Sequence, residues 1–519
     1  MFAHTEQVPK ILIFPWIRHH DVNDSLSGRT SSLPKPFPHA THFFDRSRQA
    51  LRGGAKQCEN FDEVGFSGTV RPDEYFQLQS LRHLPKMSYH VRVTFLAILI
   101  ASLTSSMAIA QVSDEPNAKP VADIPVNHVE AQAGSYTLPD PLKLLNGKPL
   151  RDAKTWFSKR RPEIVGLFEE NQFGRAPERP LLDRGKSFEI FEKSAPALNG
   201  KALRTQVRIH FSRDPKGPGA DLLIYVPANA TRGAAPLLLN ASFSANSNVV
   251  DDPGIRPGEV WNREKRRVPA SQGRAFGRIK PEILLERGIG FATIYYGDID
   301  PDFDGGIPHG VRSLFPPPAA NQWGAIGAWA WGLSRALDYL ETDKSVDAKR
   351  VALMGVSRLG KTVLWAGARD QRFAAVIASC SGEGGAALSR RNYGERIKHL
   401  AVRYGYQFAG NYAKYGDDVD SFPVDAHLLI SLVAPRPLLL QTGNTDRWSD
   451  PKGEYLAALA ATPVYKLLGK TGLDTAASMP MAGQPLLNST LAYFMHDGGH
   501  GTIPSDWDVF VKFLEMNLR

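Results

Sequence analysis

Cysteine is scarce in this chain, since Cys58 and Cys380 are the only two among its 519 residues. A structural metal site built mainly from cysteine needs more of them than this. Cys58 lies in a segment that the mature protein is expected to lack, so Cys380 would remain alone and no internal disulfide could form. A chain of this length can nevertheless be stable through its hydrophobic core.

Runs of one charge are missing as well. The 62 Lys and Arg residues are interspersed with 53 Asp and Glu residues, and the formal net charge of +9 is modest for this length. Nucleic-acid binding needs a clustered basic surface, so no nucleic-acid partner is predicted. There are also no internal repeats and no coiled-coil heptads, which leaves a structural or adhesive role without support.

The longest apolar stretch is too short to anchor the protein in a membrane. It runs from Val93 to Leu103, whereas a transmembrane helix needs roughly 20 residues. Arg92 precedes the stretch and Ala108–Ala110 follows it, which is the layout of a secretory signal peptide cleaved after Ala110. A buried core helix is the alternative interpretation. We therefore expect an exported protein, periplasmic or secreted, without a stable membrane anchor.

Four segments are expected along the chain. Residues 1–86 show no sustained periodicity and are interpreted as an upstream translation artefact before a true start at Met87, or as a disordered extension. Residues 87–110 form the signal peptide, and the polar, proline-containing residues 111–134 predict a flexible linker. Residues 135–519 run without an evident break and are expected to form one catalytic domain that acts as a monomer.

Short apolar runs alternate with helical patterns in the catalytic region. Buried strands are predicted at Asp221–Ala228, Ala235–Phe243, Gly290–Tyr296, Arg350–Val356, Phe373–Cys380 and Arg436–Gly443. Helices are predicted at Trp323–Glu341, Lys361–Asp370 and Ser505–Leu518. This alternation predicts an α/β-hydrolase fold, with a mainly parallel central sheet and helices on both faces. Ligands of such sheets bind at the carboxyl ends of the strands.

Ser357 lies between a predicted strand and a predicted helix, in the stretch Gly355–Gly360. A strand, a tight turn and a helix form the setting in which a G-x-S motif marks a nucleophile, although the spacing here is G-x-S-x-x-G. The two glycines would keep side chains out of the crowded turn. The alternative is that Ser357 merely caps the following helix.

A serine nucleophile needs a histidine base, which follows the serine and the acid in the chain order of this fold. His500 lies in a glycine-flanked loop and is preferred as the general base and acid. His496 ends an apolar, extended stretch and is expected to serve the structure.

The histidine in turn needs an acid that orients it. Asp446 is preferred because it directly follows the predicted strand Arg436–Gly443. Asp450 and Asp417 are the other candidates.

Arg358 directly follows the predicted nucleophile. Its charge could stabilise an oxyanion, a role that neutral N–H donors ordinarily fill. It could instead hold a carboxyl derivative of the substrate, or pair with a structural carboxylate. The pattern leaves these interpretations open.

Four motifs in this order resemble those of the glucuronoyl esterases, carbohydrate esterase family 15. They are GVSRLGK (Gly355–Lys361), SCSGEGGAALSRRNYGE (Ser379–Glu395), NTDRWSDP (Asn444–Pro451) and GGHGTIPSDW (Gly498–Trp507). The family comprises serine esterases that cleave the ester between 4-O-methyl-glucuronic acid on xylan and lignin alcohols. The resemblance spans essentially all of residues 135–519 and implies this activity on a glucuronoxylan or lignin–carbohydrate ester, without a metal ion or organic cofactor.

The resemblance also implies roles for single residues. Ser357 would be the nucleophile that carries the acyl group, His500 the base, and Arg358 a part of the oxyanion hole. The positions that grip the uronic acid sugar are matched by Lys361, Glu395 and Trp448. The ordinary alternatives for these three are a surface lysine, a solvated glutamate and a core tryptophan.

One position departs from the family pattern. Many members carry the acid as a glutamate just after the strand that follows the nucleophile helix, and Cys380 occupies that place here. Some bacterial members place the acid after a later strand, which Asp446 fits, and Glu383 is the fallback acid. Two other functions stay open: an esterase for other carbohydrate esters such as acetyl xylan, and a retired hydrolase that only binds polysaccharide.

Overall fold

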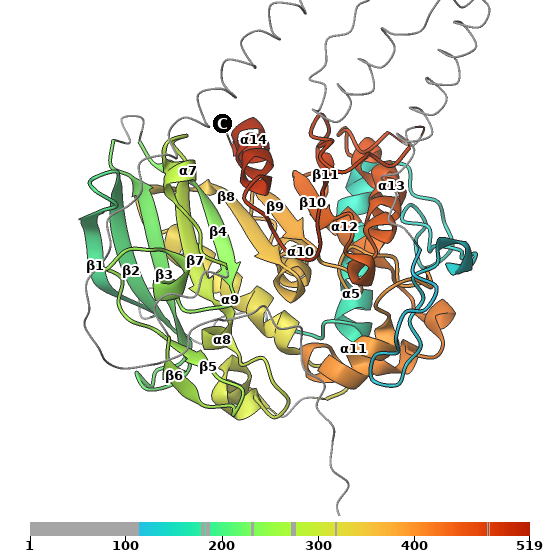
Figure 1. Ribbon diagram of the computed structural model, residues 1–519, viewed down its shortest axis with the longest axis horizontal. Coiled ribbons are helices and arrows are strands. Elements are labelled where there is room, and N and C mark those ends of the chain that lie inside the picture. Colours follow the sequence, from blue (N-terminus) through green and yellow to red (C-terminus); the bar gives the residue numbers. More distant parts are fainter. Residues whose placement is uncertain are drawn as a thin grey trace, which may run out of the picture. The chain divides into compact units, whose positions relative to one another are not determined.

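The computed structural model describes residues 114–518, with the exception of 178–181, 183–186, 230–232, 271–276, 317–318, 475 and 477 (Figure 1). The predicted signal peptide at 87–110 and the extension at 1–86, with Cys58, lie outside the described residues. No helix in the described part of the chain combines the length and the apolar character needed to span a bilayer.

A nine-stranded sheet forms the centre of the described part, in the order β1-β2-β3-β7-β4-β8-β9-β10-β11 (Figure 1). Its strands are β1 (Phe188–Ala197), β2 (Ala202–His210), β3 (Gly219–Pro227), β4 (Ala235–Ser242), β7 (Gly290–Tyr295), β8 (Val346–Val356), β9 (Ala375–Ser379), β10 (Leu438–Gly443) and β11 (Leu491–His496). Neighbours from β7 to β11 pair in parallel, whereas β1, β2, β3 and β7 pair antiparallel. The predicted mainly parallel sheet is confirmed. A short hairpin, β5 (Glu259–Trp261) and β6 (Arg267–Pro269), stands apart from it.

Helices cover both faces of this sheet, as the sequence predicts. They are α4 (Ala153–Thr155), α5 (Arg161–Asn171), α6 (Asn246–Val249), α7 (Glu282–Leu285), α8 (Tyr296–Ile299), α9 (Ala325–Leu340), α10 (Arg358–Arg369), α11 (Ile397–Tyr404), α12 (Ala426–Val433), α13 (Pro451–Leu467) and α14 (Asp506–Leu518). Successive residues of a strand point to opposite faces. Leu237 and Leu239 of β4 accordingly share a core with Trp329 of α9, while Leu238 shares a second core with Phe510 of α14.

The segment before residue 135 corrects one expectation. A flexible linker is predicted over 111–134, but residues 127–133 are fixed to the catalytic domain. The backbone N–H of Gly394 donates to the carbonyl of Asn127 (2.9 Å), and that of Asn392 donates to the carbonyl of Ala133 (3.0 Å). Glu130 pairs with Arg391 and with Lys452. Part of the polar character that suggested a solvated linker therefore comes from Glu130, whose partners lie far along the chain.

Candidate active site

Ser357 lies in a strained turn between β8 and α10. Its backbone has φ 59° and ψ −127°, a conformation that residues other than glycine rarely adopt. A Cβ atom on Gly355 would lie 2.3 Å from the carbonyl oxygen of Leu359, and one on Gly360 would lie 2.7 Å from that of Ser379. Both glycines are thus required by close backbone contacts. The Ser357 side chain makes no capping hydrogen bond to α10, so the alternative of a simple helix cap is not what the structure contains.

Asp446 and His500 form a hydrogen-bonded pair at the same edge of the sheet. Asp446 follows β10 and His500 follows β11, and these parallel neighbours pair Gly443 with His496 at their ends. Nδ1 of His500 lies 2.7 Å from Oδ2 of Asp446, while the side chains are 44% and 3% exposed respectively. The imidazole is therefore oriented by a buried carboxylate while it remains accessible from solvent.

Asp446 stays ionised at neutral pH. Burial acts to raise the pKa of this carboxyl, but hydrogen bonds from His500 and Ser449 outweigh it and the pKa is lowered. The Ser449 backbone N–H donates to Oδ1 (3.3 Å), and its Oγ lies 3.2 Å from Nδ1 of His500. Ser449 belongs to a short helix, η10 (Arg447–Ser449), for which Asp446 is the N-cap. The acid is thus held by the first turn that follows its own strand.

Ser357 follows β8, so the sheet brings it to the edge that carries Asp446 and His500. Within the described residues, no direct hydrogen bond joins the Ser357 hydroxyl to the His500 ring. Such catalytic contacts are often long in a ligand-free site and tighten when substrate binds. The three residue types required for a serine hydrolase therefore share one edge, and the base–acid contact is already formed.

The competing histidine and carboxylates have other partners. His496 is buried, with Nδ1 2.9 Å from Oδ2 of Asp506 and Nε2 3.0 Å from the carbonyl of Gly499. Its structural role agrees with the sequence interpretation. Asp450 accepts a hydrogen bond from Nε of Arg391 (2.8 Å). The exposed Asp417 pairs with a lysine at 2.6 Å. Each of these groups therefore has a partner other than His500.

Glu383 and Cys380 are buried groups near the same strand ends, and burial favours the protonated form of each. Glu383 accepts hydrogen bonds from the hydroxyls of Ser389 (2.7 Å) and Tyr412 (2.8 Å), and burial raises its pKa to about 7. The Cys380 thiol donates to the carbonyl of Gly501 (3.3 Å) and accepts from its N–H (3.2 Å), and burial raises the pKa of the thiol. The geometry therefore favours Asp446 over the fallback Glu383, while Cys380 holds the residue that follows the histidine.

Arg358 forms an ion pair with Asp302 through Nη1 and lies over the ring of Tyr404, 5.1 Å from its centroid. Burial acts to lower the pKa of the guanidinium, but the charge of Asp302 outweighs it and the pKa is raised. One of the three interpretations, pairing with a carboxylate, is thus realised. The side chain remains 29% exposed, which leaves it accessible to a ligand. Asp302 was not anticipated from the sequence, although it follows a predicted strand and the strand-end argument points to such residues.

Lys361 and Glu395 are neither a surface lysine nor a solvated glutamate. Burial lowers the pKa of Lys361 and raises that of Glu395, and each charge partly offsets the shift of the other. Trp448 is half-buried, and its ring centroid lies 5.1 Å from that of His399. The backbone N–H of Glu395 donates to the carbonyl of Trp448 (2.9 Å). Two of the three residues expected to hold a sugar are thus joined through their backbones.

One group in the described part of the chain has the composition of a metal site. Cys380, Asp446 and His500 each offer a ligand atom within 4.8 Å of the others. The Asp446 and His500 atoms already bond each other, and the thiol keeps its proton. An ion there would displace the contact that orients the imidazole.

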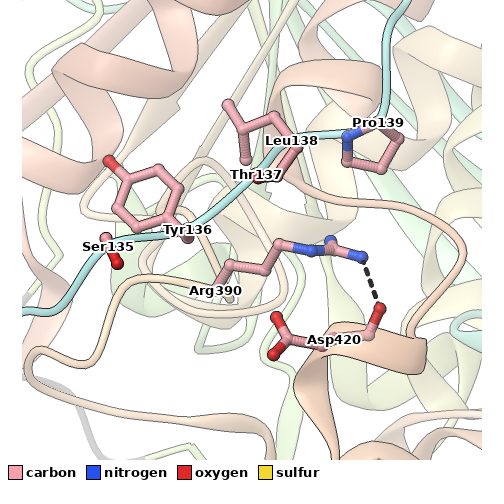
Figure 2. Close-up of a pocket in the computed structure, with 7 residues that line it drawn as sticks. All are labelled: Ser135, Tyr136, Thr137, Leu138, Pro139, Arg390 and Asp420. Carbon is pink, nitrogen blue, oxygen red and sulfur yellow. Dashed lines mark hydrogen bonds between the residues drawn. The ribbon is translucent and has the colours of Figure 1, made fainter.

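A hollow elsewhere in the described part of the chain is lined by none of the predicted catalytic or sugar-binding residues. It has a volume of about 540 Å³ and is lined by Ser135–Pro139, Arg390 and Asp420. Figure 2 shows the Arg390 side chain turned toward the backbone oxygen of Asp420, to which it donates at 3.2 Å. Arg390 also pairs with Asp425 (3.1 Å). Because its guanidinium is engaged by the protein, this hollow is not a ready anion site.

Comparison with known proteins identifies the family. A family model described as fungal glucuronyl esterase matches residues 314–469. The carbohydrate esterase MZ0003, from an unknown prokaryotic organism, is 42% identical over 76% of this chain and 92% of its own length. The structure of a glucuronoyl esterase from Solibacter usitatus is 44% identical, with a TM-score of 0.71 over 75% of this chain and 100% of the other. The chain belongs to the glucuronoyl esterases.

A further solved structure is described as a promiscuous family 15 esterase from a marine bacterial metagenome. It is 40% identical, with a TM-score of 0.68 over 76% of this chain and 100% of the other. This glucuronoyl esterase is accordingly a carboxylic ester hydrolase of the serine type on an α/β-hydrolase fold. The resemblance, the fold class and the enzyme class predicted from the sequence are confirmed.

Proposed function

We propose that this glucuronoyl esterase hydrolyses the ester between (4-O-methyl-)glucuronic acid of glucuronoxylan and lignin alcohols. The observation that carries the proposal is the hydrogen bond between His500 and the ionised Asp446, at the sheet edge that carries Ser357. The 44% identity to the glucuronoyl esterase of Solibacter usitatus supports the choice of substrate class.

The reaction begins with attack of Ser357 Oγ on the uronate carbonyl. His500 takes the hydroxyl proton through Nε2, and Asp446 stabilises the imidazolium that forms. The oxyanion is held by Arg358 and by backbone N–H groups of the turn. His500 then passes its proton to the departing alcohol, which leaves the glucuronoyl group on Ser357. A water molecule, activated by the same imidazole, releases glucuronate and restores the hydroxyl.

The sugar would be recognised by Lys361, Glu395 and Trp448. A buried lysine and a buried carboxyl can bond sugar hydroxyls strongly, because polar groups inside a protein gain more from a partner than they do in water. A half-buried tryptophan offers an apolar face to the pyranose ring.

The deciding experiment compares hydrolysis of benzyl glucuronate with hydrolysis of acetate esters, by the wild type and by Ser357→Ala. We expect the glucuronate ester to be much preferred, and the variant to lose at least about a thousandfold in kcat. Full activity in Ser357→Ala, with an unchanged melting temperature, would show that the acyl group is carried elsewhere.

A broader esterase is the second candidate. The metagenomic relative described as promiscuous is 40% identical to this chain, which favours a site that also accepts esters such as acetylated xylan. Comparable kcat/KM values on the two ester types would favour this function over the first.

We also propose that residues 87–110 direct export, because their sequence has the three parts of a signal peptide. Amino-terminal sequencing of the protein isolated from a host periplasm or culture medium is expected to begin at Gln111. A mature protein that retains the apolar stretch would contradict this.

A further inference from the structure

Asp302 occupies an unusual place among the acids of this chain. It lies just after α8 and its side chain is 9% exposed. Oδ2 accepts from Nη1 of Arg358 and from the hydroxyl of Tyr296 (2.8 Å). Oδ1 accepts from the hydroxyl of Tyr406 (2.9 Å) and from Nε2 of Gln407 (2.7 Å). A carboxylate offers about four lone-pair positions, so its acceptor capacity is filled.

These donors come from three separate parts of the chain. Tyr296 begins α8, Arg358 begins α10, and Tyr406 and Gln407 belong to the short helix η7 (Gly405–Gln407). One carboxylate therefore joins three elements at the point where the guanidinium follows the nucleophile. Because three neutral donors share its negative charge, the carboxylate is anchored without relying on Arg358 alone.

The Arg358 guanidinium contacts two protein groups and remains partly exposed to solvent. Among the described residues, Nη1 carries its protein hydrogen bond, to Asp302, and the ring of Tyr404 lies beneath the guanidinium. Nε and Nη2 remain as donors for a ligand, and the side chain is partly exposed. A guanidinium that is fixed before the reaction stabilises developing charge without the cost of reorienting.

We propose that Asp302 is a positioning residue of this esterase: it holds the guanidinium of Arg358 in the orientation from which its free N–H groups reach the oxyanion. Tyr296, Tyr406 and Gln407 align the carboxylate that does this. The proposal rests on the proposed role of Arg358 in ester hydrolysis. The competing explanation is that the pair only connects α8, α10 and η7, as many buried ion pairs connect elements.

A double-mutant cycle separates the two explanations. Asp302→Asn keeps the side-chain shape but removes the charge and one acceptor oxygen. We expect it to lower kcat on benzyl glucuronate about 10- to 100-fold and to change KM less than about threefold. The loss in kcat should not exceed the loss caused by removing a whole oxyanion donor. In an Arg358→Ala background the same substitution should cost less than about threefold further.

The matched control is Asp298→Asn. Asp298 lies in α8, four positions before Asp302, and pairs with Arg267 at 2.7 Å without contacting Arg358. It is expected to lower the melting temperature while kcat stays within about threefold of the wild type. Tyr406→Phe removes one donor to Asp302 and is expected to lower kcat about two- to fivefold, which keeps the proposal testable if Asp302→Asn does not fold.

Equal losses from Asp302→Asn with and without Arg358 would overturn the proposal, and so would an unchanged kcat in both Asp302→Asn and Tyr406→Phe. The cycle is repeated on p-nitrophenyl acetate, because every ester forms an oxyanion. If the enzyme ignored benzyl glucuronate, the proposed substrate would fail, while the coupling of Asp302 to Arg358 would still be measured on the acetate.

Discussion

Among single side chains, the ionised Asp446 beside an accessible His500 is the feature on which the chemistry depends most. The carboxylate is buried, yet His500 and Ser449 keep its pKa low. Nearby, Glu383 has a pKa of about 7 and donors from two hydroxyls. The environment thus gives the two acids opposite tendencies, one to stay charged and one to hold a proton.

The first prediction follows from this difference. Asp446→Asn should lower kcat by about ten thousandfold, because an amide cannot stabilise the imidazolium or select the reactive tautomer. Glu383→Gln, which preserves the shape and an acceptor for its hydroxyl donors, should leave kcat within about threefold of the wild type. Near-wild-type turnover in Asp446→Asn together with a large loss in Glu383→Gln would transfer the role to Glu383.

At the scale of elements, the turn between β8 and α10 fixes Ser357, the proposed nucleophile. The turn is crowded by the backbone of its neighbours, since a Cβ atom on Gly360 would lie 2.7 Å from the carbonyl oxygen of Ser379. Backbone atoms of a central strand cannot move aside as a flexible side chain can. The position of Ser357 Oγ therefore depends on residue 360 being a glycine, which has no Cβ atom.

Gly360→Ala should consequently destabilise the fold by about 1–3 kcal/mol and lower kcat about 10- to 100-fold, since small displacements of a nucleophile are costly. The control is Gly166→Ala in α5, where an added Cβ meets nothing within 4 Å. That helix should gain about 0.5–1 kcal/mol. Thermal unfolding and benzyl glucuronate turnover measure both variants, and equal behaviour of the two would contradict the crowding argument.

The elements that sequence reasoning found and missed differ in how they are buried. Leu237–Leu239 in β4 and Val351–Val356 in β8 are continuous apolar runs, which predict strands directly. In β2, by contrast, the buried side chains include Arg204 and Gln206, which bond Glu192 of β1. Those partners cannot be read from the β2 sequence, so β1 and β2 were not predicted, although their antiparallel neighbour β3 was.

The same limit applies to the site. Ser357, Asp446 and His500 were predicted from the G-x-S motif, from the chain order serine, acid, histidine, and from the loops in which they lie. The partner of Arg358 lies 56 positions earlier in the chain. Only the fold brings that carboxylate to the guanidinium, so the pairing could not be predicted from the sequence.

For the whole molecule, two buried carboxyl groups contribute to how stability varies with pH. Burial raises the pKa of Glu454 in α13 to about 8 and that of Glu383 to about 7. A carboxyl whose pKa is raised by folding favours the folded state below its ordinary pKa of roughly 4.3. That contribution is lost as the pH rises through the folded value. The contribution of these two carboxyl groups to the free energy of unfolding should therefore decline from about pH 5 to about pH 9.

Glu454→Gln tests this directly. Oε1 of Glu454 accepts from the backbone N–H of Gly382 at 2.7 Å. The amide oxygen of a glutamine can keep this contact, but the amide does not titrate. We expect the melting temperature of the wild type to fall with rising pH, and that of the variant to fall less steeply. Parallel curves from scanning fluorimetry would show that Glu454 does not titrate in this range.

The ion pairs of Glu130 bear on how the enzyme should be produced. Glu130 supplies counter-charge to Arg391 and Lys452, and Arg391 lies four positions before the glutamate expected to bind the sugar. An expression boundary drawn at residue 135, the predicted start of the catalytic region, would remove that counter-charge from a nearly buried guanidinium. Recombinant versions should accordingly retain the chain from residue 114 onward. If a shortened version hydrolysed uronate esters poorly, the loss of Glu130 would account for the low activity, and the result would not bear on the proposed catalytic residues.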